Sequence, residues 1–207
     1  MISYCFGIPT INRADLLNES LEKYVADFPD KQFIIVDNAH QDIFEHRNVT
    51  LVRKGKNLGV AASWNLLATM AFHRGYNGIL LVNDDVYWGQ KQAAVDDFMG
   101  RQSELEFVAP HVGWCNFLLS QKVFNRVGPF DENFYPAYYE DNDYRYRLKL
   151  LDVPYVQSKF LDVEIFRGSQ TIAKDPELIK WSNCESIYIR KWGGLPGGET
   201  FVTPHNK

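Results

Sequence analysis

Short apolar runs alternate with amphipathic segments along the first half of the chain. The apolar runs, each followed by polar residues, occupy residues 2–8, 33–36, 49–52 and 79–82. Apolar side chains recur at helical spacing to about Ala26, with Asn12 as the expected N-cap, and again over residues 59–72. Short buried strands that alternate with helices predict an α/β fold with a mostly parallel central sheet.

The second half of the chain has a less regular pattern. It predicts helices over residues 90–100, 120–127, about 138–151 and about 175–191, and strands over 107–109, 115–119, 154–157 and 161–166. No repeat, low-complexity run or linker divides the 207 residues. We therefore expect one domain over residues 1–207, with a Rossmann-like half at about 1–87 and an irregular half at about 88–207.

The strand predicted over residues 79–82 runs directly into Asn83, Asp84 and Asp85. Adjacent carboxylates at the end of a buried strand cost stability unless a cation or hydrogen-bond donors lie between them. Open α/β folds bind ligands at this edge of the sheet, and Mg2+ or Mn2+ prefers such oxygen ligands and bridges to phosphates. A metal site and a simple acidic turn both explain the pattern.

Three further polar segments follow predicted strands, at residues 10–13, 37–38 and 54–57. Loops after parallel strands meet at one edge of the sheet, so these segments are candidates for lining one cleft. Asp37 is suited either to accept a hydrogen bond from an N–H group of uracil or guanine, or to cap a turn. Lys54 and Lys56 either meet a diphosphate or form a solvated basic loop.

A second acidic pair, Glu140 and Asp141, opens the helix predicted at about 138–151. Carboxylates at a helix start interact favourably with the helix macrodipole, which is one explanation of the pair. The other explanation is a general base that faces the first acidic pair. The nearby tyrosines fit either core packing or a wall on which a sugar stacks; they are Tyr135, Tyr138, Tyr139 and Tyr144.

Composition narrows the classes of function. The chain is 45% hydrophobic and 23% charged, which is ordinary for a soluble globular protein, and its net charge of −4 argues against general nucleic-acid binding. Three scattered cysteines without a Cys-x-x-Cys pair argue against a disulfide framework and a zinc knuckle. No apolar run is long enough to span a membrane, and the chain begins without a secretion-signal pattern, so we expect a cytoplasmic protein.

Five motifs, taken in order, resemble those of the family 2 glycosyltransferases. They are residues 8–13, 35–38, 57–61, 81–85 and 139–143. The resemblance implies a GT-A fold, a nucleotide-diphosphate sugar as donor, with UDP preferred, and transfer with inversion to a glycan or glycoprotein acceptor. The donor would bind in the first half of the chain and the acceptor in the second.

The resemblance also assigns roles to residues by their positions. Donor contacts would come from Pro9, Thr10, Asn12, Arg13, Asp37, Lys56, Asn57, Asn83 and Asp84. Thr10 and Asp37 would hold the base and ribose, and Asp85, together with Asp84, would bind Mn2+ or Mg2+. Asp141 would be the general base, with Glu140 beside it. Asn83 stands where many members carry an aspartate, which leaves Asp85 as the direct metal ligand.

Two alternative functions remain open at this point. A sugar nucleotidyltransferase would usually carry a glycine-rich, basic loop after its first strand, and residues 7–12 are not such a loop. A carbohydrate-binding module on a transferase scaffold would not need both acidic pairs. A further resemblance, to the amino-terminal glycosyltransferase domain of a larger chlorovirus protein that helps glycosylate the capsid, implies additional domains and a location in the host cytoplasm.

Overall fold

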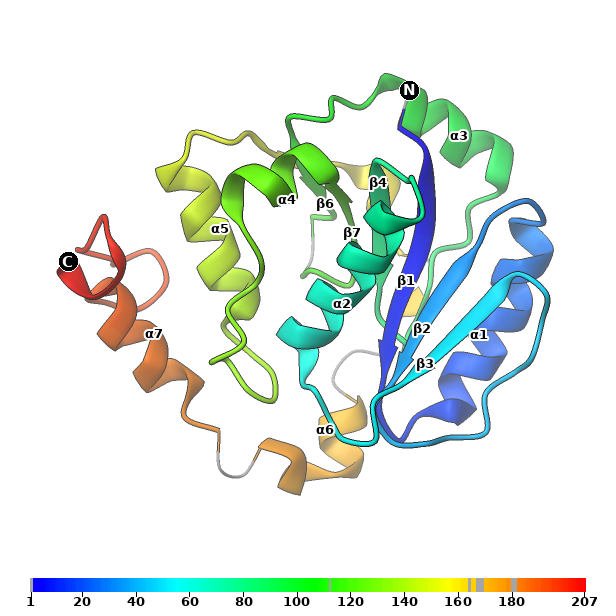
Figure 1. Ribbon diagram of the computed structural model, residues 1–207, viewed down its shortest axis with the longest axis horizontal. Coiled ribbons are helices and arrows are strands. Elements are labelled where there is room, and N and C mark those ends of the chain that lie inside the picture. The colour runs from blue at the N-terminus through cyan, green and yellow to red at the C-terminus, as the bar shows by residue number, and fades with distance from the viewer. Residues whose placement is uncertain (1, 112, 164, 167–169, 180–181) are drawn as a thin grey trace.

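A computed structural model of the protein describes residues 2–111, 113–163, 165–166, 170–179 and 182–207. Its main sheet has seven strands in the order β3-β2-β1-β4-β7-β6-β8 (Figure 1). Their bounds are β1 Tyr4–Thr10, β2 Phe33–Asp37, β3 Val49–Arg53, β4 Gly78–Val82, β6 Phe107–Ala109, β7 Asn116–Ser120 and β8 Tyr155–Gln157. All neighbours pair in parallel except β7, which is antiparallel to both β4 and β6. The predicted α/β fold with a mostly parallel sheet is confirmed.

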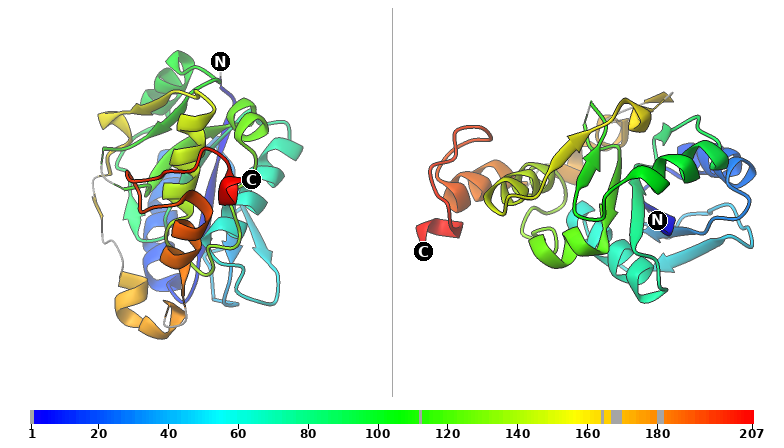
Figure 2. Two further views of the ribbon diagram at one scale, coloured as in Figure 1. Left: turned by 90° about the vertical axis from the view of Figure 1, so that its left-hand side faces the viewer. Right: turned by 90° about the horizontal axis from the view of Figure 1, so that it is seen from above.

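Helices cover both faces of the sheet, as Figure 2 shows from two sides. The α-helices that the described residues form are α1 Ala14–Asp27, α2 Val60–His73, α3 Gln92–Arg101, α4 Gln121–Val127, α5 Glu140–Leu150, α6 Gln170–Lys174 and α7 Cys184–Trp192. Helices α1 and α3 pack on one face, and α2, α4 and α5 pack on the other. Each central strand therefore buries the side chains of both its faces, which explains the continuous apolar runs in the sequence.

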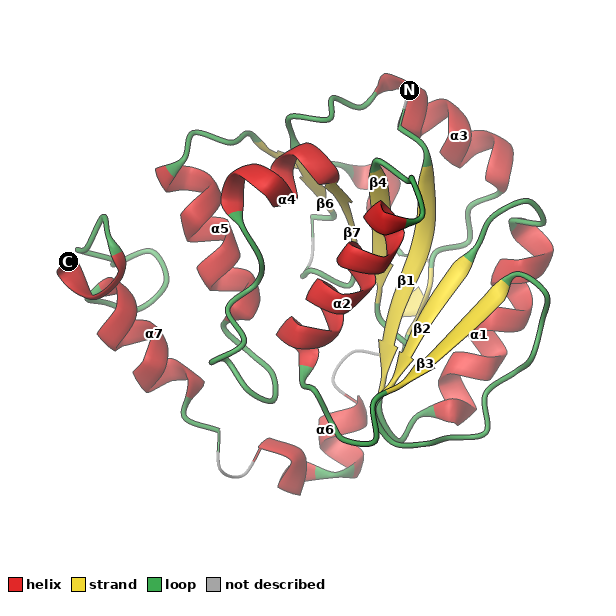
Figure 3. Cartoon of the chain, in the orientation of Figure 1, coloured by secondary structure: helices red, strands yellow, loops and turns green. Residues whose placement is uncertain are grey.

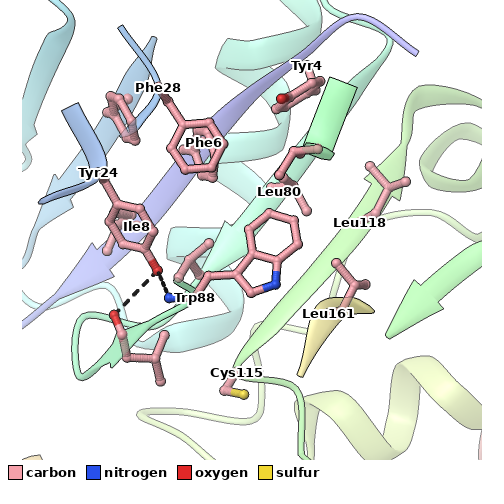
Figure 4. Packing of buried hydrophobic residues seen from close by; sticks show 14 of the residues in the cluster. Tyr4, Phe6, Ile8, Tyr24, Phe28, Leu80, Trp88, Cys115, Leu118 and Leu161 are labelled. Carbon is pink, nitrogen blue, oxygen red and sulfur yellow. Dashed lines mark hydrogen bonds between the residues drawn. The ribbon is translucent and has the colours of Figure 1, made fainter. Parts of the chain in front are cut away.

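The core on the α1 face fixes the chain just after the first acidic pair. Phe6 of β1 packs on Phe28, and Phe28 stacks on Trp88 (Figure 4). The hydroxyl of Tyr24 accepts a hydrogen bond from the backbone N–H of Trp88 at 3.0 Å and donates to the carbonyl of Val86 at 3.4 Å. The residues that follow Asp84 and Asp85 are thus anchored to α1. Here a two-residue strand, β5 (Val86–Tyr87), pairs with β9 (Ile165–Phe166).

The first strand and helix differ from prediction at their junction. Strand β1 continues through Pro9 to Thr10, because its pairing with β4 ends at Gly7 and a missing N–H beyond that point breaks no bond to β4. Asn12 is not the N-cap of α1: it has a positive φ of 56°, and Arg13 occupies the cap position. The first free N–H of the helix, at Ala14, donates instead to the side chain of Gln41 at 2.7 Å.

Two predicted elements near the end of the chain were wrong. The helix expected from about 175 to 191 is divided: Pro176–Ile179 forms a 3-10 turn, and α7 begins only after Asn183, whose backbone is not helical. Residues 180–181 lie outside the described part. The strand expected over 161–166 is reduced to β9, because a 3-10 turn (Lys159–Leu161) occupies its start. Helix α6 was not predicted.

Helix α7 is joined to α5 by a small apolar cluster and a buried carboxylate. Tyr146 of α5 packs edge-to-face on Trp192 of α7. The fully buried side chain of Asp143 accepts hydrogen bonds from Trp192 at 2.8 Å and from Arg147 at 2.9 Å, and it pairs with Lys191 at 2.6 Å. Of the helices in the described ranges, none is long and apolar enough to cross a membrane.

Candidate active site

A cavity of about 360 Å3 is lined by residues at the carboxyl ends of β1 and β4 and in the loops that follow β2 and β3. The carboxyl ends of β1, β2 and β3 converge at the lower edge of the sheet in Figure 3. Both acidic pairs line it: Asp84 and Asp85 from the turn after β4, and Glu140 and Asp141 from the start of α5. Of the other expected site residues, the cavity contains Pro9, Thr10, Asn57 and Asn83. The two halves of the chain therefore meet at one site.

Helix α2 holds the loop that leads to the second acidic pair. The backbone N–H of Val60, at the start of α2, donates to the carbonyl of Pro136 at 2.8 Å. Further along the helix, the buried amide of Asn65 both accepts from the N–H of Phe130 at 2.8 Å and donates to its carbonyl at 2.9 Å. These bonds span both ends of the segment between α4 and α5, and so they position Glu140 and Asp141 against the first half of the chain.

The carboxylate of Asp84 is held by a chain of hydrogen bonds. Gln41 donates to the hydroxyl of Thr10 at 3.3 Å, and this hydroxyl donates to Asp84, which also accepts from the backbone N–H of Ile11. Burial nevertheless raises the pKa of Asp84 to about 7, and the charge of Asp85 adds to the rise. Hydrogen bonds thus fix the position of the Asp84 side chain, and a cation bound beside it would favour its ionised form.

Asp85 offers an oxygen to which no described residue donates a hydrogen bond. Its Oδ1 atom is buried and has no hydrogen-bond partner within the described residues, and burial raises its pKa while the charge of Arg13 lowers it. No group of three or more His, Cys, Asp or Glu side chains gathers around a possible ion anywhere in the described ranges. One or two carboxylates, completed by substrate phosphates and water, are nevertheless a usual set for Mg2+. Asp85 and Asp84 fit a divalent ion of this kind.

The second acidic pair is more deeply buried than helix capping requires. Burial raises the pKa of Glu140 to about 8, with a further contribution from the negative charge of Asp141. The Oε2 atom of Glu140 is buried and lacks a partner among the described residues. Burial also raises the pKa of Asp141, but the N–H of Asn142, at 2.8 Å, and the charge of Arg145 oppose that rise.

Aromatic and aliphatic side chains form the remaining wall of the cavity. Tyr138 is one of them, and the sequence left it either in the core or in a wall on which a sugar stacks. The sequence did not single out the others as site residues; they are Trp64, Trp114, Ile172, Leu178 and Ile179. Trp64 lies on the apolar stripe of α2, so its pattern is that of a core residue. The others come from loops and short helices whose placement depends on distant contacts. Two of the tyrosines near Glu140 have different positions: Tyr138 lines the cavity and is 42% exposed, whereas Tyr144 is fully buried in the core.

Four expected donor contacts do not line the cavity. Arg13 is buried beside it and acts on both aspartates through its charge. Asn12 and Lys56 are exposed.

The side chain of Asp37, the fourth of these residues, is fully buried and bonded within the protein. Its carboxylate accepts four hydrogen bonds, from the N–H of Ala39, from the backbone and side chain of Gln41, and from Arg53. Although burial alone would raise it, these bonds hold the pKa of Asp37 below its usual value. In this arrangement Asp37 acts on the cavity through Gln41 and Thr10.

Comparisons with known proteins identify the fold. No family model matches the sequence, and no curated protein matches it. A mannosyltransferase from Pyrobaculum calidifontis, solved with GDP-Man and Mn2+, is similar in structure with a TM-score of 0.61 and 12% identity, over 77% of this chain and 55% of that chain. GalNAc-T7, solved with UDP, GalNAc and Mn2+, gives a TM-score of 0.63 and 9% identity, over 92% of this chain and 50% of that chain. A Drosophila β1,4-galactosyltransferase 7 variant, solved with manganese, UDP-Gal and xylobiose, gives a TM-score of 0.57 and 10% identity, over 84% of this chain and 74% of that chain.

These likenesses establish the GT-A glycosyltransferase fold, as expected from the sequence. This chain spans little more than half of the mannosyltransferase, and 37% of a Staphylococcus aureus protein, TarS, that also shares the fold. Membership of family 2 and the resemblance to a viral domain stay predictions.

Proposed function

We propose that this protein transfers a sugar from a nucleotide-diphosphate sugar, preferably linked to UDP, to a hydroxyl of a glycan or glycoprotein acceptor. The observation that carries the proposal is the single cavity into which both acidic pairs open, at the carboxyl edge of a GT-A sheet. The solved structures with this fold that contain UDP- or GDP-linked ligands and Mn2+ support the same substrate class.

In this proposal the first half of the chain binds the donor. Thr10, Asn57 and Asn83 offer polar groups along the cavity, and the buried Arg13 adds positive charge beside Asp84 and Asp85. Asp85, with Asp84, holds a divalent ion. When bound, that ion supplies positive charge to the diphosphate as it leaves.

The second half of the chain then activates the acceptor. Asp141 removes the proton from an acceptor hydroxyl, and the oxygen attacks the anomeric carbon from the face opposite the diphosphate. The new bond forms as the bond between that carbon and the diphosphate oxygen breaks, so a single displacement inverts the anomeric configuration. Tyr138 and Trp114 offer aromatic faces on which a sugar ring stacks.

A panel of nucleotide sugars tests the proposal. Each is incubated with the protein and Mn2+ or Mg2+, and release of nucleoside diphosphate is measured. We expect slow hydrolysis of one donor class even without the true acceptor, and NMR of the glycoside formed with an acceptor to show inversion. A sugar nucleotidyltransferase would instead release pyrophosphate from a nucleoside triphosphate and a sugar phosphate. A carbohydrate-binding module would turn over no donor.

Removal of the metal gives a separate prediction. Calorimetric binding of a UDP-sugar should weaken strongly in EDTA, because the two aspartates and the diphosphate then repel each other. Asp85→Ala should weaken binding in Mn2+ to the level that the wild type shows in EDTA. Asp97→Ala is the matched control, since Asp97 is an exposed carboxylate of α3 that lies outside the cavity. Undiminished binding in EDTA would exclude a role for metal in donor binding.

A further inference from the structure

A second cavity, of about 480 Å3, lies beside the candidate active site and has no part in the mechanism proposed above. It is lined by residues of α5, β8 and the C-terminal loop. Helix α5 and the C-terminal end of the chain lie on the side of the molecule away from β1, β2 and β3 (Figure 1). The polar lining of the cavity includes Asn142, Arg145 and Lys149 of α5, Tyr155 of β8, and Glu199 of the loop. Its volume is within the range of about 300–1,000 Å3 that small-molecule sites occupy.

The cavity carries an excess of positive charge. Arg145 and Lys149 lie four residues apart on one face of α5, where two like charges repel. Neither forms an ion pair with a carboxylate of the described residues; their side chains lie over aromatic rings, at 4.7 Å from Tyr155 and 5.7 Å from Tyr146. Glu199 is the one carboxylate among the described lining residues; its Oε1 atom accepts hydrogen bonds from the hydroxyl of Tyr188, at 2.6 Å, and the N–H of Gly197, at 3.1 Å, and the charge of Lys149 helps to lower its pKa. The two cations therefore outnumber the one anion of this cavity.

The two cavities share a wall. Asp141 lines the first and Asn142 lines the second, and the N–H of Asn142 donates to the Asp141 carboxylate at 2.8 Å. On the opposite side, the indole of Trp114 in the first cavity donates to the hydroxyl of Tyr155 in the second, at 3.2 Å. Burial raises the pKa of Asp141, and the charge of Arg145 opposes that rise. The two cavities therefore meet at neighbouring residues, one of which is the proposed general base.

We propose that the second cavity is an acceptor subsite, which binds a negatively charged sugar unit while a neighbouring hydroxyl of the same glycan lies at Asp141. The assignment rests on the proposed function for its link to catalysis. A guanidinium pairs in bidentate fashion with a carboxylate, sulfate or phosphate group, and the ring of Tyr155, over which Arg145 lies, supports the guanidinium by a cation–π contact. A uronic acid is the simplest sugar with this chemistry.

Sugar binding is measured directly, without a donor. In 15N-labelled protein the Nε–H signal of Arg145 is followed during titration with glucuronate or galacturonate, and with glucose or galactose as neutral counterparts. We expect at least one sugar acid to shift this signal and to bind about tenfold or more tightly than its neutral counterpart, as a charged hydrogen bond provides. Arg145→Gln should weaken that binding about tenfold, and Lys149→Gln should weaken it in the same direction.

Controls separate this subsite from a generally basic surface. Arg47→Gln removes an exposed cation from the loop before β3 that lines neither cavity, and it should leave the titration unchanged. Equal binding of acidic and neutral sugars, or no effect of Arg145→Gln, would overturn the proposal. So would inorganic phosphate that binds as tightly as the sugar acids, because the cavity would then be an unspecific anion site.

Donor hydrolysis, measured in the same preparations, distinguishes the two proposals. Lys149→Gln should hydrolyse the donor at the rate of the wild type, because Lys149 does not line the first cavity. Arg145→Gln does not serve in this comparison, because the charge of Arg145 acts on Asp141. A wild type that hydrolyses the donor but binds no sugar acid would remove the subsite and keep the transferase. A wild type that binds a sugar acid but hydrolyses no donor would remove the transferase and keep a saccharide site.

Discussion

Glu140 and Asp141 are neighbouring carboxylates with different surroundings. The ionised form of Asp141 is favoured by a hydrogen bond from Asn142 and by the charge of Arg145, whereas Glu140 has a buried oxygen without a described partner and a pKa of about 8. Burial raises the pKa of both groups, but at Asp141 the hydrogen bond and the charge of Arg145 oppose the rise. Asp141 is therefore the better proton acceptor of the two in this proposal, and Glu140 is the better proton donor. Two adjacent acids thus take two roles because of their environments.

This division predicts unequal effects of the two amide substitutions. Asp141→Asn keeps the size of the side chain but removes the proton acceptor, so transfer to a true acceptor should fall by about 10²- to 10⁴-fold. Donor affinity, measured by calorimetry, should hardly change. Glu140→Gln should be milder, because a neutral amide can replace a protonated acid as donor. Near-normal transfer by Asp141→Asn, with loss in Glu140→Gln, would reverse the two roles.

Asp37 gives a second prediction at this scale. If its carboxylate were unpaired and accepted a hydrogen bond from the nucleotide base, Asp37→Ala would weaken nucleotide binding more than it lowers stability. The four hydrogen bonds from Ala39, Gln41 and Arg53 leave it no free acceptor position. We now expect Asp37→Ala to lower the free energy of unfolding by about 1.5–3 kcal/mol, measured by urea denaturation, with a parallel loss of UDP affinity. A large loss of affinity at unchanged stability would restore the direct contact.

At the scale of elements, the sequence predicts what depends on local pattern. Strands β1 to β4 and helices α1 and α2 carry uniform apolar runs or stripes, and the polar residues after the strands, such as Thr10 and Asp85, reach one cavity because parallel strands end at one edge. The roles of Gln41 and Trp114 were not predictable, since each depends on a partner far away in the sequence. Antiparallel β7, inserted next to β4, likewise carries no local signal of its direction.

The junction of α2 with the loop before α5 gives a prediction about elements. Gly59 has a φ of 79°, and a Cβ atom there would lie 2.9 Å from the carbonyl oxygen of Pro136 and 2.9 Å from the ring of Tyr135. Gly59→Ala should therefore lower stability by about 1–3 kcal/mol and reduce transfer, because it displaces the loop that leads to Glu140. Gly55→Ala is the matched control.

Gly55 also has a positive φ, of 71°, but a Cβ atom there would meet nothing within 4 Å. Its substitution should show the backbone strain alone, without loss of transfer beyond the loss of stability. Thermal melts and transfer rates of the two variants would be compared. Equal effects of both substitutions would mean that the contact with Pro136 does not position the loop.

At the scale of the whole molecule, the active site lies where the first and second halves of the chain meet. Helix α7 is tied to α5 through the buried Asp143. The two halves share one sheet and both large apolar clusters, as with Phe6 and Leu118 in one cluster and Ile79 and Phe117 in the other. The cavity between them leaves buried carboxylates without full compensation. Such a site is expected to reduce the stability of the free protein, and the reduction depends on pH.

Glu140 makes the sign of this dependence testable. Its pKa is about 8 in the folded protein and near 4.5 when unfolded, so the folded state binds more protons between these values. The free energy of unfolding is then highest below about pH 4.5 as far as Glu140 is concerned, and it falls as pH rises through about 8. Urea denaturation in EDTA should show this fall between pH 5 and 8, on the order of a few kcal/mol. Glu140→Gln should flatten the profile and be the more stable protein at pH 8. If the variant and the wild type lose stability in parallel over this range, the buried carboxyl of Glu140 is not the group that titrates.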